Sequence, residues 1–248
     1  MVEPLTLGDE RLKGLFSYPT FRAEHFGRVM EDLRVLGVDQ IESIGRQEIG
    51  SLKILGKGCV GLVAVARQGA TRVAVKILRA DANRENLRGE AANLRVANSM
   101  SVGPALLGEG EMALVMEYIE GKFLAKWLQA PLAREEIAYV LKSLLSQCRR
   151  LDAEGLDHGE LSDAKKHIIV NGKGVPFILD FETASRSRAC RNLTSMVNYL
   201  FFKDSISMLT GRFFCLEKEG LREALREYKS RPTDEAYVRL MNQIGLGP

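Results

Sequence analysis

The 248-residue sequence predicts an α+β fold in two parts, and two patterns carry that prediction. Between residues 49 and 120, short apolar and β-branched runs alternate with glycine-containing turns, which is typical of antiparallel strands, and one helical pattern interrupts them. From residue 134 onward, apolar residues recur mostly with a helical period. We therefore expect a five-stranded antiparallel lobe with one helix, followed by a reduced, mostly helical lobe.

Three segments follow from these patterns: an N-terminal helical extension over residues 1–48, a first lobe over 49–120 and a second lobe over 121–248. In the extension, Thr20 is placed to cap a helix that Gly37 would end. The extension is either a small helical module or a layer packed on the lobe that follows. The packed layer is favoured, because one helix is too little for an independent domain.

Composition favours a globular protein and excludes several kinds of site. Apolar residues make up 46% of the chain, enough for a full core, and charged residues make up 27%. The 35 basic and 32 acidic residues leave a net charge of +3, so nucleic acid is expected at most as an indirect partner. The four cysteines form no Cys-x-x-Cys pair, so neither a zinc site nor a disulfide framework is predicted.

No membrane partner is expected either. The sequence opens on Met-Val-Glu-Pro, without the basic and then apolar segments of a signal peptide. No uninterrupted apolar run approaches the length that spans a bilayer. The expected location is the cytoplasm.

The first chemical motif is a glycine cluster between two strand patterns. Gly56, Gly58 and Gly61 form a GxGxxG spacing, and a loop without Cβ atoms can fold closely over phosphates. A dinucleotide-binding fold or a Walker loop would continue with a helix. Here a strand follows, then a turn and a second strand that ends in Lys76. This indicates a nucleotide site in a hairpin, the alternative being a plain hairpin with glycine bulges.

A lysine close to phosphates needs an anion to hold its charge and direction. Two acids lie in the helical pattern that follows the hairpin, Glu85 and Glu90. At about 100° per residue, Glu90 flanks the apolar stripe of that helix and Glu85 points to the opposite side. Glu90 is therefore the expected partner of Lys76, the alternative being a solvated charge at the helix edge.

The second chemical motif lies in the second lobe. A loop that reads His158-Gly-Glu160-Leu precedes a short strand, a tight turn and a second strand that ends in Asp180-Phe181. An isolated carboxylate at the end of an apolar strand is best explained by a metal ion or a ligand. This loop, strand, turn and strand order matches the way in which protein kinases present their catalytic loop and metal-binding aspartate.

Taken together, the two motifs resemble those of the protein-kinase-like superfamily over roughly residues 50–200. The glycine loop, strand lysine, helix acid, HGEL loop and Asp-Phe occur in the order of that family. The HGEL loop is similar to that of the RIO-type kinases and the kinase subunit of the KEOPS complex, and Asp-Phe-Glu also occurs in aminoglycoside and choline kinases. The resemblance implies a bilobed fold and a small, atypical, archaeal-type Ser/Thr kinase that uses ATP and Mg²⁺.

The resemblance also implies roles for individual residues. Lys76 would hold the α- and β-phosphates, with Glu90 as its partner. Glu160 would orient or deprotonate the acceptor hydroxyl, and Asp180 would bind the metal ion. The remaining expected nucleotide contacts are the three glycines of the loop, the flanking Val63 and Ala74, and the segment joining the lobes at Met116, Glu117 and Ile119, whose backbone would bind adenine.

Three departures from the family bear on activity. The loop carboxylate is Glu160, where the family has aspartate, and no Ala-Pro-Glu segment follows Asp180. The metal-binding asparagine is also missing. Counting forward from His158 reaches Lys165, and counting back from the next strand reaches His167. We favour His167 as the second metal ligand, with Asp163 as an alternative, although Mg²⁺ prefers oxygen.

Two smaller features stay open. Arg186, Arg188 and Arg191 follow the metal aspartate closely and are either a solvated face, which is favoured, or contacts to an anionic substrate. Cys59 in the glycine loop is either oxidisable or simply a tolerated small residue.

Two function hypotheses follow from the motifs. The first is a phosphotransferase acting on an unidentified protein or small-molecule hydroxyl. The second is an ATP-binding pseudokinase that serves as an interaction module.

Overall fold

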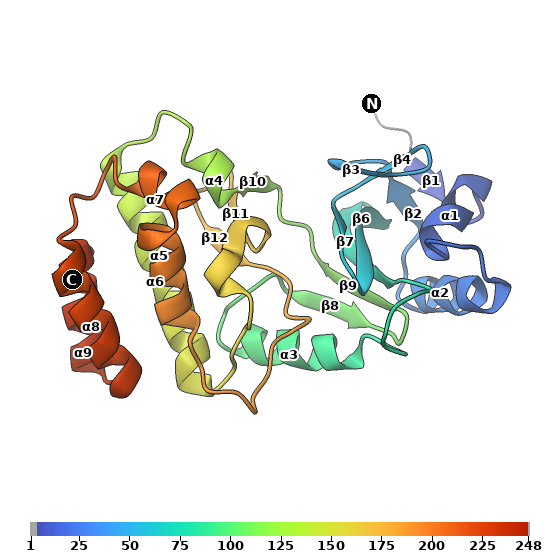
Figure 1. The fold of residues 1–248 in the computed structure, drawn as a ribbon. Coiled ribbons are helices and arrows are strands. Elements are labelled where there is room, and N and C mark those ends of the chain that lie inside the picture. Colours follow the sequence, from blue (N-terminus) through green and yellow to red (C-terminus); the bar gives the residue numbers. More distant parts are fainter. Residues whose placement is uncertain (1–3, 248) are drawn as a thin grey trace. The chain divides into compact units, whose positions relative to one another are not determined.

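The computed structural model describes residues 4–247 and is shown in Figure 1. The chain divides into two compact units. The first comprises the chain up to Asn98 together with Pro104–Ile119, and the second comprises Ser99–Gly103 and the chain from Glu120 onward. The fold is α+β, as the sequence predicts, and every named strand pair is antiparallel. None of the helices described is long and apolar enough to cross a membrane.

The first unit is built on a seven-stranded sheet, two strands more than expected. Its two extra strands come from residues before 48, and at three residues each they are too short to show a period of two in the sequence. Strand β5 (Gly56–Lys57) pairs with β6. The other strands, in spatial order, are β1 (Pro4–Thr6), β2 (Gln40–Glu42), β6 (Gly61–Gln68), β7 (Thr71–Leu78), β9 (Ala113–Glu117) and β8 (Leu106–Glu109).

Helices and a separate hairpin complete the first unit (Figure 1). The helix predicted in the N-terminal extension is confirmed as α2 (Ala23–Val35), which begins after Arg22 rather than Thr20. Gly37, just past its end, has a left-handed φ of 67°. The other elements are the one-turn helices η1 (Glu10–Leu12) and α1 (Lys13–Phe16), the hairpin of β3 (Gln47–Ile49) and β4 (Leu52–Ile54), and α3 (Arg88–Ser99).

One hydrophobic core joins the N-terminal segment to the sheet. Phe16 of α1 and Leu33 of α2 are fully buried in the same cluster as Val75 of β7. Side chains of successive residues in a strand point to opposite faces, so the neighbours of these core residues point to the other face of the sheet. That second face carries Lys76.

The second unit is mostly helical, with a three-stranded sheet in the order β10–β11–β12. Its long helix α5 ends at Gly155, which has the left-handed φ of 75° expected of a helix terminator. The side chain of Thr233 accepts a hydrogen bond from the N–H of Ala236 and caps the last helix. Strand β10 and helices α4 and α7 were not predicted.

The elements of the second unit are β10 (Gly121–Phe123), α4 (Leu124–Trp127), α5 (Arg134–Glu154), η2 (Leu161–Lys166), β11 (Ile168–Asn171), β12 (Pro176–Ile178), α6 (Asn192–Phe202), α7 (Asp204–Thr210), α8 (Lys218–Ser230) and α9 (Asp234–Ile244).

Candidate functional site

The glycine motif of the first unit forms a tight, anchored loop between β5 and β6. The backbone N–H of Gly58 donates to the carbonyl of Gly61 at 2.9 Å, which closes the turn. The guanidinium of Arg79 donates to the carbonyl of Gly58 at 2.7 Å. Lys57 and Arg79 both lie over the ring of Tyr18, 4.4 and 5.1 Å from its centroid. The loop is therefore held by its own hydrogen bond, by Arg79 and by the contact of Lys57 with Tyr18.

The pairing of the strands places the expected nucleotide contacts on one face of the sheet. Val63 is opposite Lys76, and Ala74 is opposite Met116. Opposite residues in antiparallel strands share a face, and so do residues two apart along one strand. Val63, Ala74, Lys76 and Met116 thus lie on the same face. The core side chains of β6 and β7 lie on the other, namely Leu62, Ala64, Ala66, Val73, Val75 and Ile77.

Lys76 and Glu90 form the ion pair that the sequence predicts. The ammonium of Lys76 lies 2.8 Å from Oε1 and 2.7 Å from Oε2 of Glu90, and the two residues are only 4% and 3% exposed. Glu85 is exposed but lies before α3, which begins at Arg88, so the expectation that it shares a helix with Glu90 is wrong. A buried ion pair adds little net stability because both charges lose their hydration, so its presence points to a role in function.

The side chain of Lys76 passes so close to Gly61 that it leaves no room for a Cβ there. A Cβ at this position would lie 2.8 Å from Cε and 3.0 Å from Cγ of Lys76, closer than side chains pack. The last glycine of the motif therefore allows Lys76 to run beneath the loop towards Glu90.

The segment expected to meet adenine lies at the end of β9. The N–H of Glu117 donates to the carbonyl of Ala105 at 2.8 Å, so this N–H is already engaged within the unit. Met116 is half-buried beside it, and Ile119 follows in irregular backbone. Only the first unit contributes these residues.

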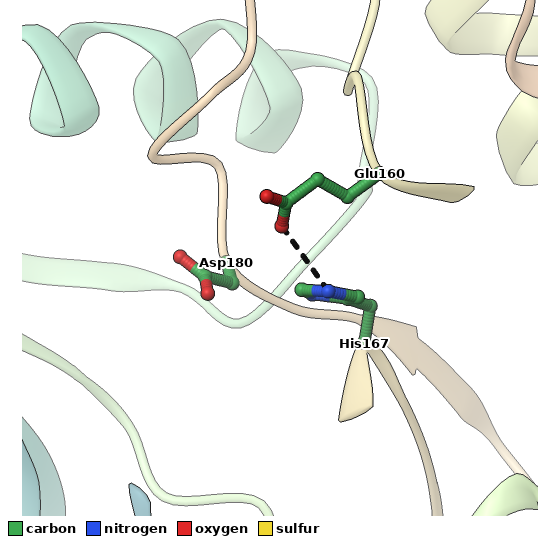
Figure 2. Close-up of side chains that lie close together, drawn as sticks. All are labelled: Glu160, His167 and Asp180. Atoms are coloured by element: carbon green, nitrogen blue, oxygen red, sulfur yellow. Dashed lines mark ion pairs between the residues drawn. The ribbon is translucent and has the colours of Figure 1, made fainter. Parts of the chain in front are cut away.

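In the second unit the structure brings Glu160, His167 and Asp180 together (Figure 2). Glu160 precedes η2 and His167 follows it, while Asp180 comes after β12. Nε2 of His167 lies 3.2 Å from Oε2 of Glu160. One ligand atom from each of the three residues lies within 4.8 Å of the other two. A hydrogen bond of 2.8 Å from the N–H of Leu179 to the carbonyl of His167 holds the two segments together.

Asp180 has an unusual backbone conformation. Its φ of 69° is in the left-handed region, which costs roughly 1–2 kcal/mol for a residue with a Cβ. Such strain persists only where the surrounding structure imposes it, and it concentrates at functional sites. Asp180 is also exposed, so its carboxylate is accessible to a ligand.

His158, the first residue of the HGEL motif, contacts the residues on either side of Asp180. It is fully buried, its Nε2 donates to the carbonyl of Leu179 at 3.0 Å, and its ring lies 5.0 Å from that of Phe181. Burial lowers the pKa of His158 to about 4, so the ring is neutral at pH 7. This histidine therefore positions the segment before Asp180.

Asn192 anchors the same loop from the start of α6, and sequence reasoning missed it. Its Oδ1 accepts from the N–H of His158 at 2.8 Å, and its Nδ2 donates to the carbonyl of Leu156 at 2.8 Å and to Asp152 at 2.9 Å. Asn192 is 1% exposed. No signal in the sequence marks it, because an asparagine at the start of a helix is ordinary.

Among the alternatives for the second metal ligand, His167 is the residue that meets Glu160 and Asp180. Asp163 instead forms an ion pair with Lys203 at 3.0 Å, and Lys165 is exposed.

The arginines behind Asp180 make structural contacts. Nε of Arg188 donates to Asp157 at 3.0 Å, and its Nη2 donates to the carbonyl of Thr183 at 2.7 Å. Arg186 pairs with Glu154 on the surface at 3.2 Å. The interpretation of Arg186 and Arg188 as substrate contacts has no support in this geometry.

The donor set of the second unit suits a divalent cation but is unusual for Mg²⁺. Two of the three donors are carboxylates, which bind hard cations. The third is an imidazole, which suits transition metals better than Mg²⁺. In addition, Nδ1 of His167 is buried and makes no hydrogen bond to any residue between 4 and 247. The group therefore fits a metal ion, with Mg²⁺ the less well matched choice.

Comparison with known proteins adds little to this geometry. No protein-family model matches the chain. The chain is similar to an uncharacterized protein of Methanocaldococcus jannaschii, with 26% identity over 117 residues. That match covers 46% of this chain and 98% of the archaeal protein. An assignment of function to this chain must therefore come from its own residues.

Proposed function

We propose that the protein is an atypical, protein-kinase-like phosphotransferase with a bilobed kinase fold, acting in the cytoplasm. It would transfer the γ-phosphate of ATP to a hydroxyl group. The observation that carries this proposal is the buried Lys76–Glu90 ion pair beneath the glycine loop. A fold without a ligand for this lysine gains little from burying two charges.

The first unit supplies the nucleotide contacts in this proposal. The loop of Gly56, Gly58 and Gly61 covers the phosphates, and Lys76 neutralises them while Glu90 fixes its direction. Val63, Ala74 and Met116 share the face of Lys76 and offer an apolar surface to the adenine ring. The carbonyl of Glu117 and the backbone of Ile119 supply hydrogen bonds to that ring.

The second unit supplies the groups for the transfer. Asp180 and His167 would hold the metal ion, which neutralises charge on the phosphates when bound. The carboxylate of Glu160 orients the acceptor hydroxyl and takes its proton. The proposal requires both sets of residues to act on the same ATP molecule. The acceptor is a serine or threonine of a protein or a small-molecule hydroxyl.

One observation favours a second candidate, a nucleotide-binding pseudokinase. Glu160 is one methylene longer than the family's aspartate, and its carboxylate lies 3.2 Å from Nε2 of His167. A carboxylate engaged in this way is a poorer base for a substrate hydroxyl. In this alternative the first unit binds ATP and the second has lost the transfer step.

The test combines γ-labelled ATP with calorimetry on the full chain. The phosphotransferase should bind ATP with a metal-dependent gain in affinity and release or transfer label at a rate that depends on Lys76. ATP binding without any turnover, over a panel of protein and small-molecule acceptors, would favour the pseudokinase. Absence of ATP binding with both Mg²⁺ and Mn²⁺ would exclude both candidates.

A further inference from the structure

The second unit contains an open, basic groove formed by α6 and α8, apart from the residues assigned to phosphotransfer. Its hollow measures about 430 Å³. The side chains around it are all cationic or neutral, with no carboxylate among them. They are Arg191, Thr194, Ser195 and Asn198 at the first helix and Arg222, Leu225, Arg226 and Lys229 on the second.

Helix α8 separates its charges by sign. At about 100° per residue, Arg222, Arg226 and Lys229 fall within an arc of about 60°. The acids Glu219, Glu223 and Glu227 fall within the adjacent arc of about 80°. Glu227 pairs with Arg239 of α9 at 3.0 Å, outside the groove, while the basic side of α8 lines the groove.

The positive charge of the groove is only partly neutralised. Glu219 lies 3.1 Å from Arg222 and 3.7 Å from Arg226. Within the described part of the chain, no carboxylate lies within ion-pair distance of the side chain of Arg191 or Lys229. Like charges three and four residues apart on a helix destabilise it by a few tenths of a kcal/mol per pair. The Glu219–Arg222 pair offsets part of that cost, and the side chains of Arg191 and Lys229 gain nothing from it.

We propose that this groove binds the sugar–phosphate backbone of a nucleic-acid strand. Arginine and lysine, together with serine, threonine and asparagine, are the side chains that contact phosphate and sugar oxygens. From Arg222 to Lys229 the basic stripe is about 10 Å long, which matches about three nucleotides of a helically stacked strand at about 3.4 Å per nucleotide along its axis.

The shape of the groove selects this ligand over a phosphorylated peptide. A single phosphate group is best held by arginines that converge on one point in an enclosed pocket. Here the cations follow one another along a helix and the hollow is open. No aromatic side chain lines it, so bases have nothing to stack on. Binding should therefore depend on charge and little on sequence.

The experiment measures binding of a fluorescein-labelled, single-stranded 12-nucleotide RNA to the full chain by anisotropy, at several salt concentrations. One phosphate contact from each of the four cations, Arg191 and the three on α8, predicts a slope of about −3 in log K against log[salt], from about −0.7 per contact on single strands. Arg226→Glu should lower the affinity about tenfold and bring the slope to about −2. The matched control is Arg212→Glu, an exposed arginine outside the groove, which should leave both values unchanged.

Three results would overturn the proposal. They are no binding of the RNA at low salt, a slope near zero, or an equal loss of affinity in the Arg226→Glu and Arg212→Glu variants. A phosphoserine peptide serves as the competing probe. If it binds in an Arg226-dependent manner and the RNA does not, the groove is a phosphoprotein site instead.

Discussion

The Lys76–Glu90 pair of the first unit and the Glu160–His167–Asp180 group of the second differ in how the fold holds them. Lys76 and Glu90 are 4% and 3% exposed, and their contact runs through the packed interior. In the second group the side chain of Glu160 is 42% exposed and Asp180 stands in a strained backbone conformation. Packing in the interior holds the first pair in position, whereas loops hold the second group.

Under the proposed function the two regions also differ in how they match the kinase motifs that the sequence resembles. Lys76 and Glu90 match those motifs, whereas the departures concern the open group and the segment after Asp180. Buried charges tolerate little change, because removing one leaves the other without compensation. Exposed side chains on loops can change with little cost in stability. Substitutions in the two regions should therefore differ in their effect on stability.

Lys76→Met should destabilise the protein by about 3–5 kcal/mol, because it leaves the Glu90 carboxylate buried without the lysine. It should also abolish ATP turnover. The double variant Lys76→Met, Glu90→Leu should recover most of the stability and none of the ATP affinity. Urea denaturation and calorimetry measure the two quantities. A stable single variant with unchanged ATP affinity would remove the kinase interpretation of the hairpin.

Gly61→Ala should cost about 1–3 kcal/mol, since the new methyl group would lie 2.8 Å from Cε of Lys76 and 3.2 Å from the carbonyl of Ile77. ATP affinity should fall as the lysine is displaced. Gly89→Ala is the control, because nothing lies within 4 Å of a Cβ there and alanine favours the helix. Thermal denaturation should separate the two variants clearly. Equal stability would mean that Lys76 moves aside freely.

Asp180→Gly should stabilise the protein by about 1 kcal/mol, because glycine adopts a φ of 69° without the steric cost of a Cβ. It should at the same time remove the metal-dependent gain in ATP affinity. Ser101→Gly, at a φ of 56°, is the matched control and should stabilise similarly with the metal effect intact. The same metal effect in the wild type and in Asp180→Gly would show that Asp180 is not a ligand.

Glu160→Gln should leave stability within about 0.5 kcal/mol of the wild type, as expected of a partly exposed side chain. Turnover should nevertheless be mostly lost. Glu160→Asp should lower the rate by on the order of a hundredfold, because the carboxylate moves by about 1 Å. Single-turnover kinetics give both rates. If Glu160→Gln turns over as fast as the wild type, this residue is not the base.

His167→Asn should alter the choice of metal. The wild type should bind Mn²⁺ about tenfold more tightly than Mg²⁺ in the presence of a non-hydrolysable ATP analogue, since imidazole favours the transition metal. An oxygen donor in place of the imidazole should reduce that preference. Electron paramagnetic resonance of Mn²⁺, with Mg²⁺ as competitor, measures it. An unchanged preference in His167→Asn would exclude the ring as a ligand.

The sequence predicts the strands around the glycine motif and the long helices, because their periods extend over many residues. It also predicts Glu90 as the partner of Lys76, and Glu90 is that partner in the structure, although the competing acid Glu85 lies before the helix instead of on its far side. Strands β1 and β10, each three residues long, escape prediction because no period can be read from them.

The site of the second unit is less predictable for a different reason. Its parts are held by contacts between loops, such as those of Asn192 with His158 and Leu156. Such contacts join residues that are far apart in the chain and leave no pattern within a window of sequence. Counting along the chain accordingly left Lys165, His167 and Asp163 as alternatives for one position, and only the folded structure distinguishes them.

The anchoring of the glycine loop has a thermodynamic consequence. A loop that closes over a ligand from a disordered state loses conformational entropy at that moment, and the loss weakens binding. Here Arg79 and Tyr18 order the loop when the chain folds. The entropy loss is thereby transferred from association to folding. Replacing Tyr18 should therefore leave the enthalpy of ATP binding nearly unchanged and make its entropy less favourable.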